Sequence, residues 1–325
     1  MLEIKDLSVR YGKQAPTIEH FNLNMKKGEI ISVVGESGSG KTTVIRAVLG
    51  ALAGGGKVTQ GDILFNGKSL LTNTKDEWRQ LRGTRISMIF QDCGGTLNPI
   101  RKIGSQFVEY ICTHSKVSKD EAWKKGVSML EKMRLPEAEN IMNSYPHQLS
   151  GGMRQRVMIA MALVCEPDIL IADEPTTALD VTIQAQILEL MQDLQKKLGM
   201  AIIMVTHDLG VIASMCDEIL VMYGGRVCER GTADDIFYRP AHEYTKGLLR
   251  SIPKADNMNE KLVPIGGTPI NLLQMPAGCA FCPRCDAAMK ICLSEKPEEL
   301  RISDTHLASC WMNIKELYEA QEEAE

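Results

Sequence analysis

A glycine-rich loop between an apolar segment and a helical one is the feature that most constrains the fold of this chain. Residues 35–42, Gly35-Glu36-Ser37-Gly38-Ser39-Gly40-Lys41-Thr42, fit the pattern G-x-x-x-x-G-K-[ST], with a strand predicted at 30–34 and a helix at 42–52. Glycines let backbone N–H groups face phosphate oxygens, and a helix N-terminus adds partial positive charge. We expect these residues and Thr43 to bind a nucleotide, with Lys41 at its β- and γ-phosphates and Thr42 at Mg²⁺. A chance match in a glycine-rich turn is the alternative.

Strand-like and helical segments alternate along the first 250 residues. Mostly apolar runs of strand length lie at 30–34, 86–90, 169–172, 201–205 and 219–222. One helical pattern between them repeats Ile183, Ile187, Leu190, Leu194 and Leu198 at spacings of three and four. This alternation predicts an α/β fold with a mainly parallel sheet covered by helices.

Two segments depart from that alternation. Residues 2–9 and 17–25 alternate in polarity, which predicts a small antiparallel layer near the N-terminus. From 99 to 165 the pattern is almost wholly helical. We therefore expect a helical subdomain at about 92–165, inserted between two core strands.

Polar side chains follow three of the predicted strands. Asp173 and Glu174 end the strand at 169–172, and in phosphate-loop enzymes such carboxylates bind Mg²⁺ and polarise the attacking water, respectively. His207 and Gln91 follow two other strands, at the sheet edge where ligand sites concentrate. We expect His207 to contact the γ-phosphate or the water, and Gln91 to complete the Mg²⁺ shell. For Asp173 and Glu174 the alternative is an acidic helix cap, and for His207 it is a purely structural role.

A second device for binding phosphate begins at Ser150. Ser150-Gly151-Gly152 opens a predicted helix that runs to Cys165, with Ser150 as its N-cap. Glycines weaken a helix start, yet they expose N–H groups to an anion. One nucleotide rarely needs two such devices from one chain, so we expect a dimer in which each nucleotide lies between the loop of one subunit and this helix of the other. An ordinary capped helix is the alternative.

The balance of charge and hydropathy excludes two other classes. Lys and Arg number 37 against 41 Asp and Glu, a net charge of −4, which does not suit a bulk nucleic-acid binder. The N-terminal residues lack the pattern of a signal peptide. The longest apolar run, 157–165, has about half of the length that a membrane span needs. We therefore expect a soluble cytoplasmic chain, one able to dock onto a membrane protein.

Half of the ten cysteines gather near the C-terminus, which marks a second region. A Pro- and Gly-rich linker at 251–277 separates them from the rest, so we expect domains at 1–253 and 254–325, ending in an acidic helical tail at 316–325. By spacing alone, C-x₂-C-x₂-C with one more cysteine suits zinc or an iron–sulfur cluster. A reduced, metal-free segment is the alternative. The clustered cysteines are Cys279, Cys282, Cys285, Cys292 and Cys310.

Together these segments resemble the ATPase subunits of ABC transporters, over residues 1 to about 253. The signature Leu149-Ser150-Gly151-Gly152-Met153 carries the resemblance, with its place after Lys41 and Gln91 and before Asp173, Glu174, Asp180 and His207. The resemblance implies that Tyr11 stacks on the adenine of ATP and that Asp180 belongs to a loop communicating between two subunits. It also implies that Gln91 faces the membrane subunits.

The chain is most similar to the oligopeptide/dipeptide/nickel importer subfamily. In that subfamily a [4Fe–4S] cluster is implied, held by Cys279, Cys285, Cys292 and Cys310 at the spacing C-x₅-C-x₆-C-x₁₇-C, with Cys282 left over and zinc as the alternative metal. Cys93 stands where the subfamily usually has proline after Gln-Asp. The segments that carry this closer resemblance are 96–99 (Thr-Leu-Asn-Pro), 145–148 (Tyr-Pro-His-Gln), 174–182 (Glu-Pro-Thr-Thr-Ala-Leu-Asp-Val-Thr), 240–245 (Pro-Ala-His-Glu-Tyr-Thr), 278–285 (Gly-Cys-Ala-Phe-Cys-Pro-Arg-Cys), and His306 with Cys310.

The resemblance implies an ATPase that powers import of peptides, or of nickel or a related small solute. Its expected partners are a second ABC ATPase, more commonly a different chain, two transmembrane permease subunits and an extracytoplasmic solute-binding protein, at the cytoplasmic face of the membrane. Helices near Gln91 and 99–111 would pass the motion of the dimer to the permease. A soluble ABC protein of DNA repair or translation is the first rival. A nucleotide kinase is the second, and it would not need Ser150-Gly151-Gly152.

Overall fold

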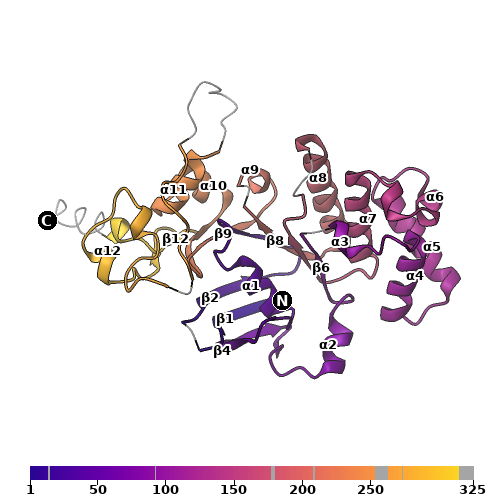
Figure 1. The fold of residues 1–325 in the computed structure, drawn as a ribbon, viewed down its shortest axis with the longest axis horizontal. Helices are drawn as coiled ribbons and strands as arrows, with labels where there is room; N and C mark the ends of the chain where they lie inside the picture. Colours follow the sequence, from indigo (N-terminus) through magenta and orange to yellow (C-terminus); the bar gives the residue numbers. More distant parts are fainter. Residues whose placement is uncertain are drawn as a thin grey trace. The chain divides into compact units, whose positions relative to one another are not determined.

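The computed structural model describes residues 1–13, 15–91, 93–176, 180–207, 209–252, 263–272 and 274–314 (Figure 1). The chain divides into two compact units. The first comprises Met1–Met25, Ile30–Leu71 and Val205–Glu325, and the second comprises Lys26–Glu29 and Thr72–Met204. The predicted domain boundary at 253 and the predicted acidic helix at 316–325 lie outside the described residues, as do Thr177, Ala178, Leu179 and Asp208.

The antiparallel layer predicted near the N-terminus is present in the first unit. Strand β1 (Leu2–Tyr11) pairs antiparallel with β2 (Ile18–Met25), and alternate residues of β2 are buried, as expected for a strand with one face on the core. On its other side β1 pairs with β4 (Gly56–Phe65), which is followed by β5 (Lys68–Ser69). We did not predict β4 because its first half is mostly exposed and polar, so its sequence carries no strand-like apolar pattern.

The phosphate loop follows β3 (Ile30–Val34), a fully buried strand that lies parallel to β9 (Glu218–Tyr223). Next to β9 runs β10 (Arg226–Gly231), antiparallel, and β10 pairs in turn with β12 (Leu307–Ala308) and β12 with β11 (Leu300–Arg301). The cysteine-rich segment, residues 279–310, therefore returns to extend the sheet of the first unit. The residues between β11 and β12 are drawn in yellow in Figure 1.

The helices of the first unit are short. They are α1 (Lys41–Val48), α9 (Leu209–Ile212), α10 (Ala233–Tyr238), α11 (Glu243–Arg250), the 3₁₀ turn η2 (Cys282–Arg284) and α12 (Ile291–Ser294). The helix after the phosphate loop ends at Val48 rather than at 52. Gly50 has a φ of 59°, a left-handed conformation that ends helices, and the N–H of Ala51 bonds back to the carbonyl of Arg46 at 2.8 Å.

The second unit confirms the predicted parallel strands and the helical stretch. Strand β6 (Ile86–Ile89) lies parallel to β7 (Ile169–Asp173), and β8 (Ala201–Thr206), whose last two residues belong to the first unit, neighbours β7. The helical elements of this unit are α2 (Lys75–Leu81), α3 (Cys93–Thr96), α4 (Ile103–His114), α5 (Lys119–Lys132), α6 (Ala138–Asn143), η1 (Pro146–Gln148), α7 (Gly151–Leu163) and α8 (Val181–Leu198).

Local sequence signals set the ends of several of these helices. Ser118 caps α5 by accepting a hydrogen bond from the N–H of Glu121, whose carboxylate bonds back to Ser118. Helix α8 ends at Gly199, which has a φ of 62°. Helix α5 packs on α4 and α6 through Gly126, where an added Cβ would come within 2.7 Å of Met142. In the part of the chain that the structure describes, no helix has the length and apolarity needed to cross a membrane.

Candidate nucleotide-binding site

The phosphate loop in the first unit is built around glycines that nothing larger could replace. Gly40 is the N-cap of α1 with a φ of 105°, and a Cβ there would lie 2.4 Å from Cδ1 of Ile18. A Cβ on Gly35 would lie 2.3 Å from the carbonyl oxygen of Met222 in β9. The loop is thus pressed against its own sheet and leads directly into the N-terminus of α1, where partial positive charge favours an anion.

Lys41 lies against the loop that it follows. Its Nζ donates to the carbonyl oxygens of Gly35 at 2.6 Å and Glu36 at 2.9 Å, and the residue is only 6% exposed. The ammonium is therefore held by the loop rather than by solvent. A phosphate bound by this loop would meet a preplaced positive charge able to form a charge-assisted hydrogen bond. Thr42 and Thr43, both half-buried, lie on the first turn of α1.

Glu36 has two contacts that the sequence did not predict. Its backbone N–H donates to the hydroxyl of Tyr244 in α11 at 2.8 Å, and its carboxylate accepts two hydrogen bonds from the guanidinium of Arg284, at 2.5 and 3.0 Å. Burial raises the pKa of Tyr244 well above its usual value, so its hydroxyl stays neutral. Both partners lie in segments that carried the subfamily resemblance, but no sequence signal paired them with the loop.

The second unit brings Gln91 and Glu174 into contact. The Nε2 of Gln91 donates to Oε2 of Glu174 at 2.7 Å. Because β6 and β7 are parallel neighbours, the residues that follow them lie at the same edge of the sheet, as the sequence predicted. Asp173, the last residue of β7, is 6% exposed.

Glu174 has an unusual backbone for a residue with a side chain. Its φ is 47°, in the left-handed region, which costs an L-residue about 1–2 kcal/mol. The bond to Gln91 and the half-buried setting hold the carboxylate in place. Such strain is typical of functional positions. A fixed carboxylate beside an amide suits a group that orients a water molecule for attack.

The helix that starts at Ser150 matches its prediction in local geometry. Ser150 Oγ accepts a hydrogen bond from the N–H of Met153 at 3.3 Å, which caps α7. Ser150 and Gly151 are exposed, and a Cβ on Gly151 would meet no atom within 4 Å. The start of α7 is therefore exposed at Ser150 and Gly151, whereas a Cβ on Gly152 would lie 3.1 Å from Cγ2 of Ile183. Asp180 caps α8 in the same way, accepting from Ile183 at 2.9 Å.

The expected site residues fall into two sets. The phosphate loop and Tyr11 lie in the first unit, and so does the exposed His207 that follows β8. The half-buried Tyr11 faces Gly56, its partner in β4, where a Cβ would meet the tyrosine ring at 2.7 Å. The second unit holds Gln91, Asp173, Glu174, Ser150, Gly151, Gly152 and Asp180. That both sets meet at one nucleotide stays a prediction.

The C-terminal cysteines gather around one small cavity in the first unit. Cys279, Cys282, Cys285, Cys292 and Cys310 all line it, together with His242 and Glu243. Within the described ranges, no group of three or more His, Cys, Asp and Glu side chains is arranged so that it could hold a metal ion. The metal-binding character of this segment therefore stays a prediction.

Two thiols of this cluster, those of Cys279 and Cys285, have strongly raised pKa values. Burial, together with the neighbouring Cys292 and Cys310, raises the pKa of Cys279 to about 11. The pKa of Cys285 also rises to about 11, through burial first. Backbone N–H groups directed at the sulfur act in the opposite direction, from Phe281 and Cys282 on Cys279. Without a cation the thiols stay protonated, whereas these N–H groups would stabilise thiolates once a cation arrives.

The fold and the two sets of residues define a phosphate-loop protein with a carboxylate beside a glutamine at the ends of parallel strands. Comparison with models of known protein families shows which class of protein this is. Residues 18–177 match the ABC transporter model, and residues 228–292 match the model of the C-terminal region of oligopeptide/dipeptide transporters. The chain belongs to the ABC transporter family, among its ATP-binding subunits.

Known relatives match almost the whole chain. It is 47% identical over 320 residues to the oligopeptide transport ATP-binding protein OppD of Escherichia coli, covering 98% of this chain and 94% of that protein. It is 48% identical to OppD of Bacillus subtilis, covering 96% and 88%, and 47% identical to the dipeptide transport ATP-binding protein DppD of the same species, covering 96% and 94%.

Solved structures resemble about three quarters of the chain. One is a dimeric ATP-binding cassette in a post-hydrolysis state with ADP and Pi, 29% identical with a TM-score of 0.63, covering 72% of this chain and 99% of that one. Another is cbiO1 from Clostridium perfringens, part of a transporter complex, 31% identical with a TM-score of 0.64, covering 73% and 90%. They confirm the phosphate-loop ABC ATPase fold predicted from the sequence.

Proposed function

We propose that this chain binds and hydrolyses Mg–ATP as the ATPase subunit of an importer of oligopeptides or dipeptides. The observation that carries the proposal is the near full-length identity of 47% with a protein named as an oligopeptide transport ATP-binding protein. The phosphate loop, the Gln91–Glu174 pair and the capped helix at Ser150 in this chain suit that role.

In this proposal the phosphate groups bind to the loop at 35–42 and to the ammonium of Lys41. The oxygen donors of Thr42, Gln91 and Asp173 hold Mg²⁺, a hard cation that prefers such ligands. Bound Mg²⁺ neutralises charge on the phosphate oxygens. Glu174 orients the attacking water, and His207 contacts the γ-phosphate. Tyr11 stacks on the adenine. The buried, preplaced Lys41 and the fixed Glu174 carboxylate support these assignments.

The exposed start of α7 supports a shared nucleotide site. Ser150, Gly151 and Gly152 would contact the γ-phosphate of ATP bound to the loop of a partner ATPase, with Asp180 in the loop between the subunits. The dimeric cassette that resembles this chain gives independent support for such an assembly. We favour a different chain as the partner. Two permease subunits and an extracytoplasmic solute-binding protein complete the proposed importer, with this chain on the cytoplasmic face of the membrane.

Uptake by cells that lack this chain tests the proposal. Labelled di- and oligopeptides should enter only when the wild-type chain is restored, and Glu174→Gln, produced at the same level, should fail to restore uptake. Uptake of Ni²⁺ that depends on the chain, with peptide uptake unchanged, would instead assign it to a nickel importer. Co-purification from native membranes identifies the partner ATPase and the permeases.

We also propose that Cys279, Cys285, Cys292 and Cys310 hold a [4Fe–4S] cluster with a structural role. Thiolates are the usual ligands of such clusters, and the four cysteines line one cavity. Backbone N–H groups point at the sulfurs of Cys279, Cys285 and Cys310. Cys282 lines the same cavity, and the resemblance leaves it outside the ligand set.

Anaerobic purification tests the cluster. The wild-type chain should be brown, and each of Cys279→Ser, Cys285→Ser, Cys292→Ser and Cys310→Ser should lose iron. Cys282→Ser is the matched control and should keep it. A colourless protein with one zinc and no iron would show that zinc, the alternative metal, is the native one. Iron lost in Cys282→Ser but kept in Cys310→Ser would assign the ligands to the four cysteines nearest in sequence.

A further inference from the structure

Arg284 joins the cysteine-rich segment to the phosphate loop. It ends the 3₁₀ turn η2, between Cys282 and Cys285, and lies 248 residues from its partner Glu36 in the sequence. Two guanidinium nitrogens donate to the two carboxylate oxygens, at 2.5 and 3.0 Å. This two-pronged geometry requires a planar fork of donors, which arginine has and lysine lacks.

The surroundings of Arg284 fix it in this position. Its side chain is only 4% exposed, and Nε donates to the carbonyl oxygen of Gly266 at 2.8 Å. The guanidinium also lies over the rings of Tyr223 and Phe281, 5.8 and 6.0 Å from their centroids. Because breaking such a buried ion pair leaves an uncompensated charge, each partner constrains the other strongly.

Glu36 transmits this constraint to Lys41. Its carboxylate is held by Arg284, its N–H by the hydroxyl of Tyr244, and its carbonyl oxygen accepts the Lys41 ammonium at 2.9 Å. The side chain, the N–H and the carbonyl of this one loop residue are therefore all occupied. Of the two loop carbonyls that hold Lys41 Nζ, one therefore belongs to the residue that Arg284 binds.

We propose that Arg284 is a positioning residue for ATP: through Glu36 it sets the conformation of the phosphate loop and of Lys41, so the cysteine-rich segment contributes to the nucleotide site. The inference rests on the proposed binding of ATP by this loop. Arg284 does not touch the nucleotide. Its loss lowers the affinity for ATP, and it leaves the hydrolytic residues Gln91 and Glu174 as they are.

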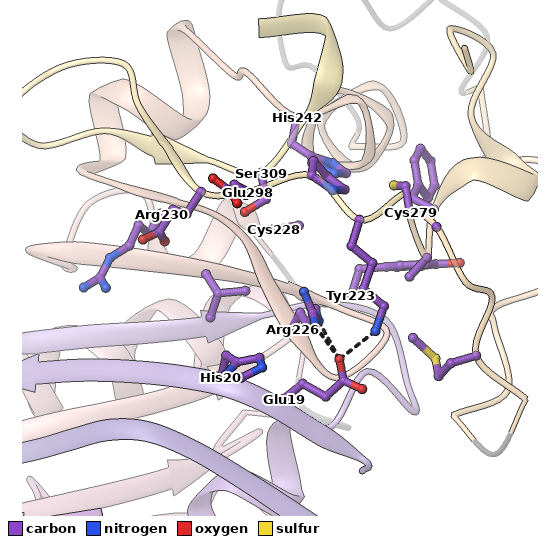
Figure 2. A pocket seen from close by; sticks show the side chains of 18 of the residues that line it. Glu19, His20, Tyr223, Arg226, Cys228, Arg230, His242, Cys279, Glu298 and Ser309 are labelled. Carbon is purple, nitrogen blue, oxygen red and sulfur yellow. Dashed lines mark hydrogen bonds and ion pairs between the residues drawn. The ribbon is translucent and has the colours of Figure 1, made fainter. Parts of the chain in front are cut away.

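A second ion pair attaches the same segment to the rest of the unit and supplies a matched control. Lys296 donates to Oε2 of Glu19 in β2 at 2.8 Å, and Arg226 of β10 binds the same oxygen (Figure 2). These residues border a cavity of about 330 Å³ between the two strands and the cysteine-rich segment. Glu19 is outside the phosphate loop, so Lys296→Met weakens this attachment without removing a contact of Glu36.

Equilibrium titration of the full-length chain with a fluorescent ATP analogue, and steady-state kinetics of the complex that co-purifies with its partner subunits, test the proposal. Arg284→Met should raise the Kd at least tenfold and raise KM with kcat at saturating ATP changed less than twofold. The Kd of Arg284→Lys should lie between those of the wild type and Arg284→Met, because an ammonium cannot form the two-pronged contact. Lys296→Met should stay within twofold of wild type in both Kd and KM. Glu36→Gln combined with Arg284→Met should bind no worse than Arg284→Met alone, since no unpaired carboxylate charge is left beside the loop.

Three results would overturn the inference. One is a Kd unchanged in Arg284→Met. Another is an equal loss in Arg284→Met and Lys296→Met, which would show a general effect of segment docking. If Arg284→Met fails to fold, Arg284→Lys takes its place in the comparison with Lys296→Met. Equal Kd values for these two variants then count as the second result. The third is a wild-type chain that binds no ATP, which removes the proposed function as well; in the first two results ATP binding by the wild type stands and only the role of Arg284 falls.

Discussion

Replacement of Lys41 by alanine tests the chemistry of the phosphate loop most directly. The ammonium makes hydrogen bonds of 2.6 and 2.9 Å to two loop carbonyls and is almost fully buried, so its position is set before ATP arrives. One hydrogen bond to a charged group contributes about 1.5–3 kcal/mol. Lys41→Ala should therefore weaken ATP binding about tenfold to a hundredfold.

Equilibrium binding of a fluorescent ATP analogue, with and without Mg²⁺, measures this loss. Lys132→Ala, which removes an exposed lysine at the end of α5, is the matched control and should bind ATP like the wild type. Both variants should have melting temperatures close to that of the wild type. A Kd for Lys41→Ala within twofold of wild type would show that the ammonium does not contact the phosphates, and the assignment of the loop would have to be abandoned.

Two further predictions concern hydrolysis. Glu174→Gln should bind ATP nearly as well as the wild type but stop turnover, because the amide keeps the contact with Gln91 and loses the charge that orients water; turnover within about threefold of wild type would move the role to His207. The isolated chain should be mostly monomeric and hydrolyse ATP poorly, with specific activity rising with protein concentration or added partner, because the γ-phosphate needs donors from Lys41 and from a second subunit's Ser150 helix. Full activity at nanomolar protein, independent of concentration, would refute the shared site.

The sequence predicted much of the local structure at the candidate site, because each of these signals spans only a few neighbouring residues. The loop at 35–42 lies between a strand and a helix, as expected. The placing of Gln91 and Glu174 at the same edge followed from a rule of parallel sheets, that neighbouring strands end there, but their hydrogen bond was not predicted. Ser150 and Asp180 cap their helices through the side-chain oxygens that such positions favour.

Other features escaped sequence reasoning because their partners are far apart in the chain. The pairing of β10 with β12 places Glu229 opposite Ala308, and only two residues of β12 take part, too few for any periodic pattern. Strand β4 was missed because its exposed first half lacks apolar residues. The buried Glu229 is a further case, since it accepts from the N–H groups of Ala241 and His242 and contacts His306 at 2.7 Å.

The sequence by itself determined which residues we propose for the chemistry of this protein. A phosphate loop, a capped Ser-Gly-Gly helix and polar residues at strand ends are local patterns, and local patterns are visible without a fold. Tertiary structure alone decided that Arg284 of the cysteine-rich segment binds Glu36 of the phosphate loop. Ion pairs carry no periodicity, and burial of the guanidinium, which makes the pair strong, arises only when the chain folds back on the loop.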